Sequence, residues 1–290
     1  MDCEGVSLSR AGTVELVSIC FSHKPSVVYL VDLCSKSNHR LLQRRLSAVR
    51  DLCQCSTVTK VIHDSRMDSD ALYHLHSINL VTVHDTSCYH SVVSGQEDVN
   101  LNDTLMAYNL GSNSSRLSSI YSVNPTFWAT RPLTNQMKEW AAGDVSKLLS
   151  LAKMQRERLF GRSLRNAMTK SHQRSTLILK LKLELGLICK IDVRQFIGSG
   201  GSNIRQLQQE SGALVYSNQQ AGRNAWLVYY PNKAALVKVK KAMGYECGTG
   251  WRTTTKIGTT VAGAGLVVAS GGTVMIGAGI AVVGKLLTAE

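Results

Sequence analysis

The sequence of 290 residues lacks the cysteine and histidine spacings that bind zinc. Its eight cysteines include no Cys-x-x-Cys pair, and only Cys53 and Cys55 lie close together. We therefore expect no zinc site. No N-terminal signal sequence is present, and scattered cysteines without one are typical of free thiols in a reducing compartment. The sequence thus predicts an intracellular, cytoplasmic protein.

Acidic residues are scarce in the second half of the chain. Residues 1–150 contain 13 Lys and Arg against 14 Asp and Glu, whereas residues 151–290 contain 20 against 6. The second half therefore carries all of the excess positive charge. A basic module attached to a neutral one favours a polyanionic partner, either nucleic acid or an anionic membrane surface. The alternative is a solvated basic face without a partner.

Charge is absent altogether from residues 257–284. This segment exceeds the length of about 20 apolar residues that spans a bilayer, and its Gly-Ala-Gly triplets resemble helix interfaces in membranes. Arg252 and Lys256 precede it, and Lys285 follows it. The pattern favours a transmembrane segment that anchors the protein to a membrane by its tail. A re-entrant hairpin and a flexible, sticky tail are the alternatives.

The length favours two domains, and hydrophobic periodicity predicts an α/β fold. Residues 2–6, 13–21 and 27–33 have the composition of three strands in a meander. We expect residues 94–124, which are rich in Ser and Asn, to form a long loop or irregular insertion. Residues 132–154 have helical spacing interrupted near Gly143. The first domain is therefore assigned to residues 1–155.

Four acidic residues are candidate metal ligands. Residues two apart on a strand face the same way, so Asp2 and Glu4 project together. Asp68 begins the helix that follows the fourth strand, and Asp144 lies on the last helix of the domain. Four converging carboxylates repel one another unless hard cations such as Mg²⁺ or Mn²⁺ lie between them. Two such ions about 3.5–4 Å apart are the known device for phosphodiester hydrolysis.

The sequence around these residues resembles the RNase D branch of the DEDD 3′–5′ exonucleases. The resemblance covers residues 1–155 and looks closest to the animal germline branch related to Egalitarian and the exonuclease-like proteins of piRNA biogenesis. It implies an RNase H-like fold, with a mixed five-stranded sheet flanked by helices, and a two-metal site. It also implies supporting roles for His63 and Asp85. The matching strings are DCEGVSLSR (2–10), KVIHDSRMDSDAL (60–72), VHDT (83–86), FWATRPL (127–133) and AAGDV (141–145).

Two features depart from that family pattern. The family's tyrosine subgroup has a Tyr four residues before the last Asp, where its hydroxyl orients the attacking water, and Trp140 stands in this catalytic position here. An indole offers one N–H donor and no acceptor, so it cannot reproduce the phenol. The resemblance also implies that the first strand starts several residues before Asp2. Trp140 leaves two interpretations open, an active nuclease and a catalytically weak or inactive one.

A second resemblance, to a KH domain, covers residues 176–245. The expected order begins with a strand at 177–185, and a GxxG loop then joins two helices. Small residues let a nucleic-acid backbone approach such a loop closely, and KH domains clamp about four nucleotides of single strand in this way. We expect residues 156–175 to form a basic linker or helix before this domain. The candidate nucleic-acid-binding residues are Arg194, Gly198, Ser199, Gly200, Gly201 and Arg205.

The sequence thus predicts a metal-dependent 3′–5′ exonuclease that acts on single-stranded RNA, or DNA, with help from a KH domain. The main alternative is an RNA-binding adaptor built on an exonuclease fold. A third interpretation is a membrane scaffold that binds protein through both domains. Salt-sensitive binding of an oligonucleotide would exclude the scaffold, because phosphate contacts weaken with salt.

Overall fold

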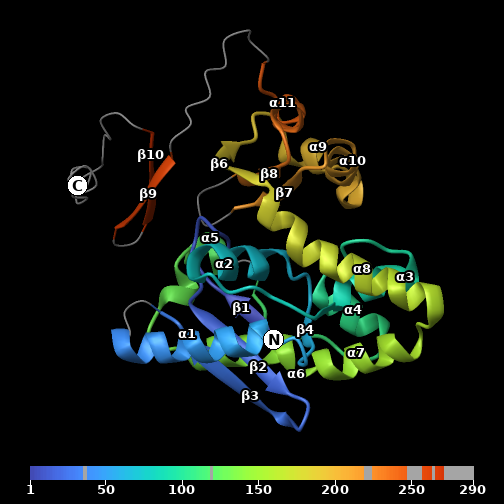
Figure 1. The fold of residues 1–290 in the computed structure, drawn as a ribbon. Coiled ribbons are helices and arrows are strands. Elements are labelled where there is room, and N and C mark those ends of the chain that lie inside the picture. The colour runs from blue at the N-terminus through green and yellow to red at the C-terminus, as the bar shows by residue number, and fades with distance from the viewer. Residues whose placement is uncertain (35–37, 118–119, 219–223, 247–256, 263–264, 271–290) are drawn as a thin grey trace. The chain divides into compact units, whose positions relative to one another are not determined.

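The computed structural model describes residues 1–290 except 35–37, 118–119, 219–223, 247–256, 263–264 and 271–290. The chain divides into two compact units, Met1–Tyr245 and Glu246–Glu290. The first unit contains an α/β module followed by a smaller α+β module, whose order along the chain can be followed in Figure 1.

The α/β module is built on five strands. β1, β2 and β3 form an antiparallel sheet in chain order, which confirms the expected meander. β4 and β5 pair in parallel. The expected five-stranded sheet is thus divided into a three-stranded and a two-stranded sheet. A hydrogen bond from the Met1 ammonium group to Val61 O, at 2.7 Å, links β1 to β4. The strands are β1 Asp2–Glu4, β2 Leu16–Phe21, β3 Lys24–Asp32, β4 Lys60–Ile62 and β5 Val83–Asp85.

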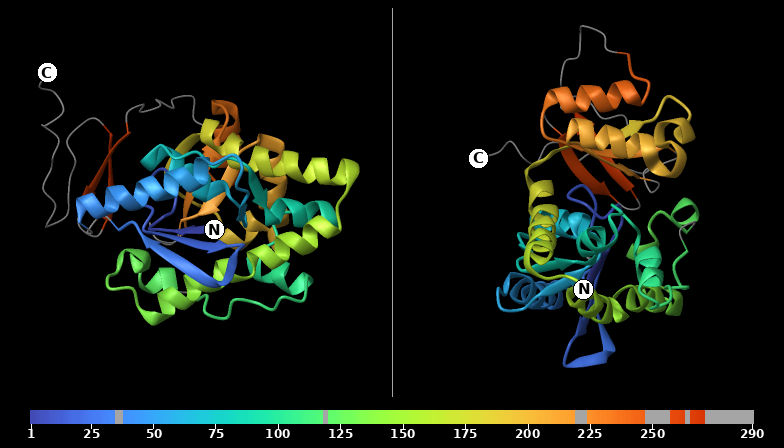
Figure 2. Two further views of the ribbon diagram at one scale, coloured as in Figure 1. Left: turned by 60° about the horizontal axis from the view of Figure 1, so that its bottom comes forward. Right: turned by 90° about the vertical axis from the view of Figure 1, so that its right-hand side faces the viewer.

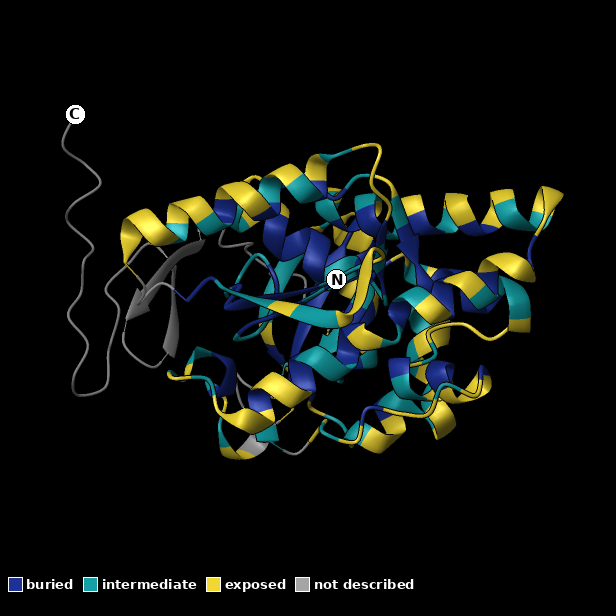
Figure 3. Ribbon diagram, turned by 90° about the horizontal axis from the view of Figure 1, so that it is seen from below, coloured by how far each residue is buried: buried dark blue, intermediate teal, exposed yellow. Residues whose placement is uncertain are grey.

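Helices cover both faces of the antiparallel sheet. Alternate residues of β2 enter different cores: Val17 and Ile19 pack with α1 and α2, whereas Leu16 packs with α6. Figure 3 shows the buried residues gathered on the strands and on the inward sides of the helices. The helical segments of this module are α1 His39–Gln54, α2 Arg66–His76, α3 Thr86–Ser94, α4 Leu101–Ala107, α5 Ile120–Val123, η1 Phe127–Ala129, α6 Asn135–Ser146, α7 Leu148–Glu157 and α8 Gly161–Leu177.

Two sequence expectations differ from the structure in this module, and a third leaves a helix open. The region 94–124 is not wholly irregular, because α4 begins at Leu101, where Asn100 accepts a hydrogen bond from Asp103 N at 2.9 Å as an N-cap. The helix break lies at Lys147 and not at Gly143, which is inside α6. Residues 156–175 are mostly helix α8, which is one of the two forms expected for this segment.

Helix α8 belongs to the packing of the α/β module. Its small residues Ala167, Ser171 and Ser175 are buried, and their spacing of four places them on one helix face. Ser171 Oγ accepts from Asp85 N at 3.0 Å, which ties the helix to the end of β5. The small side chains therefore allow a close approach of α8. Of its basic residues, Arg162 and Arg165 are exposed, whereas Lys170 and Arg174 pair with acidic residues of the α/β module.

The second module has the order β-α-α-β-β-α, with β8 between β6 and β7 in an antiparallel sheet. The first strand begins at Lys182, later than expected, because Leu177 ends α8 and a 3₁₀ turn follows. Figure 2 shows the helices of this module on one side of its sheet. The elements are η2 Ile178–Lys180, β6 Lys182–Ile188, α9 Val193–Ile197, η3 Ser199–Gly201, α10 Ser202–Ser211, β7 Leu214–Ser217, β8 Ala225–Tyr230 and α11 Lys233–Ala242.

Buried polar contacts fix the second module to helix α2. Asp70, on α2, is fully buried and accepts from Tyr229 Oη at 2.7 Å. Arg10 donates to the same carboxylate at 2.8 Å and to the carbonyls of Ile178 and Leu181, both at 2.9 Å. Charge-assisted hydrogen bonds of this kind are strong, and they fix the relative positions of the groups that they join. The helix that carries Asp68 is thus also the one that contacts the second module.

In the second unit, the described residues form one antiparallel pair of strands, β9 Ile257–Ala262 and β10 Gly265–Ser270. The rest of the segment 257–284 lies outside the described residues. Among the helices that the structure describes, none has both the length and the apolar character needed to cross a membrane.

Candidate metal centre and nucleic-acid interface

Three carboxylates from two distant segments meet at one point. Asp2 and Glu4 flank Cys3 on β1; since Cys3 packs toward α1 and α2, the two acids face the side of α6. Asp144 reaches them from α6, and ligand oxygens of the three residues all lie within 4.8 Å of one another. Glu4 and Asp144 are buried. This is the convergence that the sequence predicted for three of its four acidic candidates.

The fourth candidate, Asp68, lies at the same pocket but outside that group of three. It sits in the first turn of α2, where its Oδ1 accepts from Cys3 N at 2.8 Å. A pocket of about 480 Å³ is lined by Asp68 together with Asp2 and Glu4. The hydrogen bond therefore locks the Asp68 carboxylate against the middle of β1, between the two acidic residues of that strand.

Burial raises the pKa of all four carboxyl groups, and repulsion within the cluster raises the pKa of Asp2 and Glu4 further. Burial is the main cause for all four, and it raises the pKa of Asp68 to about 6. The charges of Asp68 and Asp144 raise the pKa of Asp2 further. Buried carboxylates close to one another are unfavourable in their charged form when no cation is present. Their oxygen atoms are the ligands that Mg²⁺ and Mn²⁺ prefer. The donor set therefore fits the metal type that the sequence predicted.

The loop before α5 supplies two residues that the sequence did not single out. Asn113 Nδ2 donates to Asp144 Oδ1 at 2.8 Å and to Trp140 O at 2.9 Å. A Cβ at Gly143 would lie 2.5 Å from the Asn113 side chain, so the glycine leaves the space that this side chain fills. Arg116 Nε lies 3.6 Å from Asp144 Oδ2. The loop thus brings an amide and a guanidinium group to the acidic cluster.

Trp140 is buried in an aromatic cluster beneath Asp144. Its ring centroid lies 5.8 Å from that of Phe127 and 5.5 Å from that of Trp128. Arg116, the Asn113 amide and the Trp140 side chain all oppose the effect of burial on the pKa of Asp144. Trp140 therefore influences the neighbouring carboxylate, one turn away on the same helix.

His63 and Asp85 have structural partners. His63 is bracketed by Thr86 Oγ1 at 2.9 Å and Val99 O at 3.0 Å, and burial lowers its pKa. Asp85 caps the N-terminus of α3 and accepts from Ser65 N and Ser65 Oγ, both at 2.8 Å. These contacts hold the segment between β4 and α2, and so they position Asp68 indirectly.

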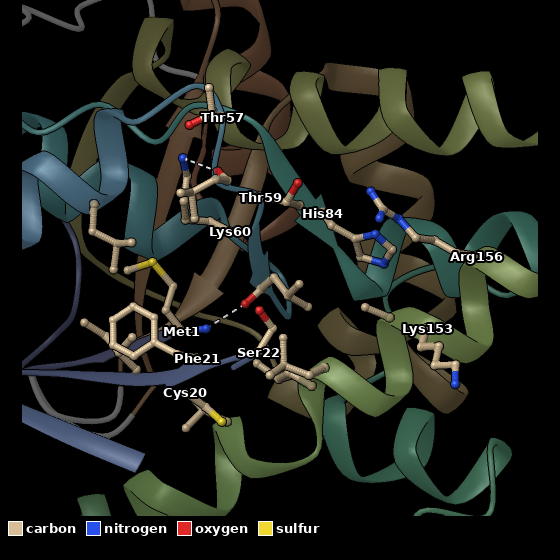
Figure 4. Close-up of a pocket in the computed structure, with 18 of the residues that line it drawn as sticks. Met1, Cys20, Phe21, Ser22, Thr57, Thr59, Lys60, His84, Lys153 and Arg156 are labelled. Atoms are coloured by element: carbon tan, nitrogen blue, oxygen red, sulfur yellow. Dashed lines mark hydrogen bonds between the residues drawn. The ribbon is translucent and has the colours of Figure 1, made fainter. Parts of the chain in front are cut away.

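A larger pocket of about 680 Å³ is also present in the α/β module and is a poor candidate for the metal site. It lies among β2, β4 and α7, with Met1, Phe21 and Leu148 in its wall. Figure 4 shows Lys60, Lys153 and Arg156 there, and among the described residues that line it Glu157 is the single carboxylate. A single carboxylate among cations does not form a divalent metal site, so size does not identify the centre in this protein.

The second module contributes to the acidic pocket. Tyr216, Ser217 and Asn218, in and after β7, line the same pocket of about 480 Å³ as Asp2. Ser7, in the loop after β1, donates to Asn218 Oδ1 at 3.0 Å. The pocket wall is therefore built by both modules, which the sequence did not predict.

The glycine turn of the second module lies where the sequence placed it. It joins α9, which carries an exposed Arg194, to α10, and the intervening η3 contains Ser199. Gly198 and Gly201 have φ values of 76° and 81°, a region that favours glycine. Arg205 donates to Gly200 O at 2.5 Å. The guanidinium group thus closes the turn.

Comparison with known proteins identifies the class of the α/β module. A family model described as 3′–5′ exonuclease matches residues 1–159. Among solved structures, NrnC of Brucella melitensis bound to pGG is 22% identical, with a TM-score of 0.47, over 61% of this chain and 82% of that chain. The same protein with bound Mg²⁺ is 21% identical, with a TM-score of 0.47, over 61% and 83%.

Escherichia coli RNase D, described as an exoribonuclease involved in structured RNA processing, is 14% identical, with a TM-score of 0.45, over 69% of this chain and 46% of that chain. No curated protein matches the chain. The fold and the acidic pocket define a nuclease-type α/β module with an RNase H-like architecture. Because the family model covers more than half of the chain, the protein belongs to the 3′–5′ exonuclease family, whose members are phosphodiester hydrolases.

Proposed function

We propose that this protein is a metal-dependent 3′–5′ exonuclease that acts on single-stranded nucleic acid, with RNA as the favoured substrate. One observation carries the proposal: a chain of the 3′–5′ exonuclease family brings Asp2, Glu4 and Asp144 within 4.8 Å of one another, with Asp68 at the same pocket. The retained carboxylates favour catalysis over a purely structural use of the fold.

These four residues would hold two Mg²⁺ or Mn²⁺ ions. When bound, such ions activate the attacking water and stabilise charge on the scissile phosphate and on the leaving 3′ oxygen. The chain itself supplies the geometry. Cys3 N fixes Asp68, and Asn113 fixes Asp144. Carboxylates held in this way need little reorganisation during the reaction.

Trp140 would support Asp144 and would not position the water. Its indole has no acceptor for a water proton, and the side chain is only 2% exposed. Since water positioning contributes orders of magnitude to a rate, we expect an enzyme slower than relatives with tyrosine there. Because Trp140 is expected to slow catalysis, an RNA-binding adaptor is the second candidate function.

The second module would bind the substrate as a KH domain. Its β-α-α-β-β-α order and the glycine turn between α9 and α10 support this assignment. In KH domains such a turn contacts the backbone of about four nucleotides. Arg194 near the turn adds positive charge. Arg205 contributes by holding the turn closed through Gly200 O.

The contact between the modules supports delivery of the substrate to the acidic site. β7 borders the acidic pocket, and Tyr229 and Asp70 join the module to the helix of Asp68. A strand bound by the second module would therefore approach the carboxylates along a fixed path. Membrane attachment through residues 257–284 and the relation to the germline branch of the family remain predictions from the sequence.

Gly200→Asp tests the substrate-binding part. A Cβ at Gly200 meets no atom within 4 Å, and its φ of 54° is one that Asp tolerates. The variant should fold and place a negative charge beside the phosphates. We expect loss of single-stranded RNA binding in a fluorescence anisotropy titration. Binding equal to that of the unchanged protein would contradict the KH assignment.

The hydrolytic part is tested by the release of nucleoside monophosphates from a single-stranded RNA. We expect release with Mn²⁺ or Mg²⁺, no release in EDTA, and strong inhibition when the 3′ hydroxyl of the RNA is blocked. Equal release from RNA with a free and with a blocked 3′ end would contradict the exonuclease direction. RNA binding without any release would favour the adaptor.

A further inference from the structure

Arg116 is placed over the acidic cluster by an anchored loop. Three residues earlier, Asn113 binds both Asp144 and the Trp140 carbonyl. Asn102 then fixes the backbone of Asn113 from α4: its Oδ1 accepts from Asn113 N at 2.8 Å. These hydrogen bonds fix the loop against α6, and they thereby place Arg116 beside the candidate metal ligands.

The ion pair between Arg116 and Asp144 is a long one. Its Nε is 3.6 Å from Asp144 Oδ2, longer than a good charge-assisted hydrogen bond. The guanidinium carbon lies 5.9 Å from the centre of the Trp140 ring. The side chain is 40% exposed, whereas that of Asp144 is 2% exposed. Arg116 is thus a partly solvated cation that faces a buried anion.

Arg116 is the charged side chain that offsets burial at three of the carboxylates. Arg116 lowers the pKa of Asp2, Glu4 and Asp144 against the raising effect of burial. It also lines both the pocket of about 480 Å³ and a neighbouring one of about 280 Å³. Among the described residues that line these two pockets, it is the single lysine or arginine.

Divalent ions and a guanidinium group cannot share these carboxylates without repulsion. Two ions would bring four positive charges to the cluster, so they would displace Arg116 toward solvent. A displaced arginine at the mouth of this pocket would meet the substrate backbone. Its planar fork matches phosphate oxygens in a bidentate way, and it stays charged at any working pH.

We propose that Arg116 is a phosphate-binding residue of the active site: it pairs with Asp144 in the metal-free protein and transfers to a substrate phosphate once metal ions displace it. The inference rests on the proposed function, since it assumes that the pocket accepts metal ions and nucleic acid. It adds a competition between Arg116 and metal ions for the carboxylates, which the acidic cluster alone does not imply.

The first test is a calorimetric titration of the full chain with Mn²⁺ in the absence of nucleic acid. Arg116→Gln removes the competing cation, so we expect Mn²⁺ affinity to rise about five-fold, the size of a partly exposed ion pair. Arg116→Lys should keep the affinity near that of the unchanged protein. Arg44→Gln, at an exposed position of α1, is the control for the lost charge. Equal Mn²⁺ affinity in Arg116→Gln and the unchanged protein would overturn the competition.

The second test measures binding of a labelled single-stranded RNA in Ca²⁺, so that the readout does not depend on hydrolysis. We expect Arg116→Gln to weaken binding about ten-fold or more, and Arg116→Lys to recover only part of it, because an ammonium group cannot bind phosphate in a bidentate way. Equal weakening in Arg44→Gln, or no weakening in Arg116→Gln, would overturn the phosphate role. Absence of hydrolysis by the unchanged protein in Mn²⁺ would refute the proposed function but leave both Arg116 tests valid.

Discussion

Asp68→Asn should stabilise the metal-free protein at neutral pH. Burial raises the pKa of Asp68 from 3.8 to about 6, even though Cys3 donates a hydrogen bond to it. Between those two pKa values the folded protein binds more protons than the unfolded chain, so the free energy of unfolding falls as pH rises. The difference corresponds to about 3 kcal/mol above pH 6. Asparagine avoids this loss and can still accept from Cys3 N.

The assay is urea denaturation in EDTA at pH 4 and pH 7.5, with Asp51→Asn at an exposed position as the control. We expect Asp68→Asn to be more stable than the unchanged protein by up to about 3 kcal/mol at pH 7.5. Near pH 4 the two should be nearly equal. Mn²⁺ should stabilise the unchanged protein more than the variant, because the ion binds the folded state through Asp68. A variant that is less stable in EDTA at pH 7.5 would refute the reasoning.

Three further substitutions test other parts of the site. Gly143→Ala should lower the hydrolysis rate about 100-fold, because a Cβ 2.5 Å from the Asn113 side chain must displace it; an unchanged kcat would contradict this. Tyr229→Phe should lower the free energy of unfolding by about 1–3 kcal/mol in urea denaturation, because the buried Asp70 loses a 2.7 Å hydrogen bond; a neutral effect would show that this contact does not hold the modules. Trp140→Tyr should raise kcat about ten-fold if a phenol can orient the water, and a slower enzyme would argue against that role.

The sequence was informative where local pattern determines structure. The strand meander is set by alternating side chains and a short turn, so β2 and β3 could be predicted. It was less informative where packing decides. α8 has the basic composition of a linker, but Ala167, Ser171 and Ser175 let it pack closely on β5. Strand β6 begins late because α8 and the turn at Ile178–Lys180 extend into the expected strand.

The same contrast holds at the site. The carboxylates could be found because each lies in a recognisable local string. Asn113 and Arg116 could not, because their roles come from a loop that meets α6 only in the folded protein. Gly143 was the available signal: a glycine inside a helical pattern often marks a close approach. The helical spacing predicts a break near this glycine, whereas in the structure Gly143 lies inside α6 and makes room for Asn113.

The most direct test of the account is degradation of a 5′-labelled single-stranded RNA with Mn²⁺ and with Mg²⁺, with Asp144→Ala as the control. The account predicts a ladder that shortens from the 3′ end and is absent with the variant. An RNA that is bound but keeps its full length under both metals would contradict the enzyme and leave an adaptor on a nuclease fold.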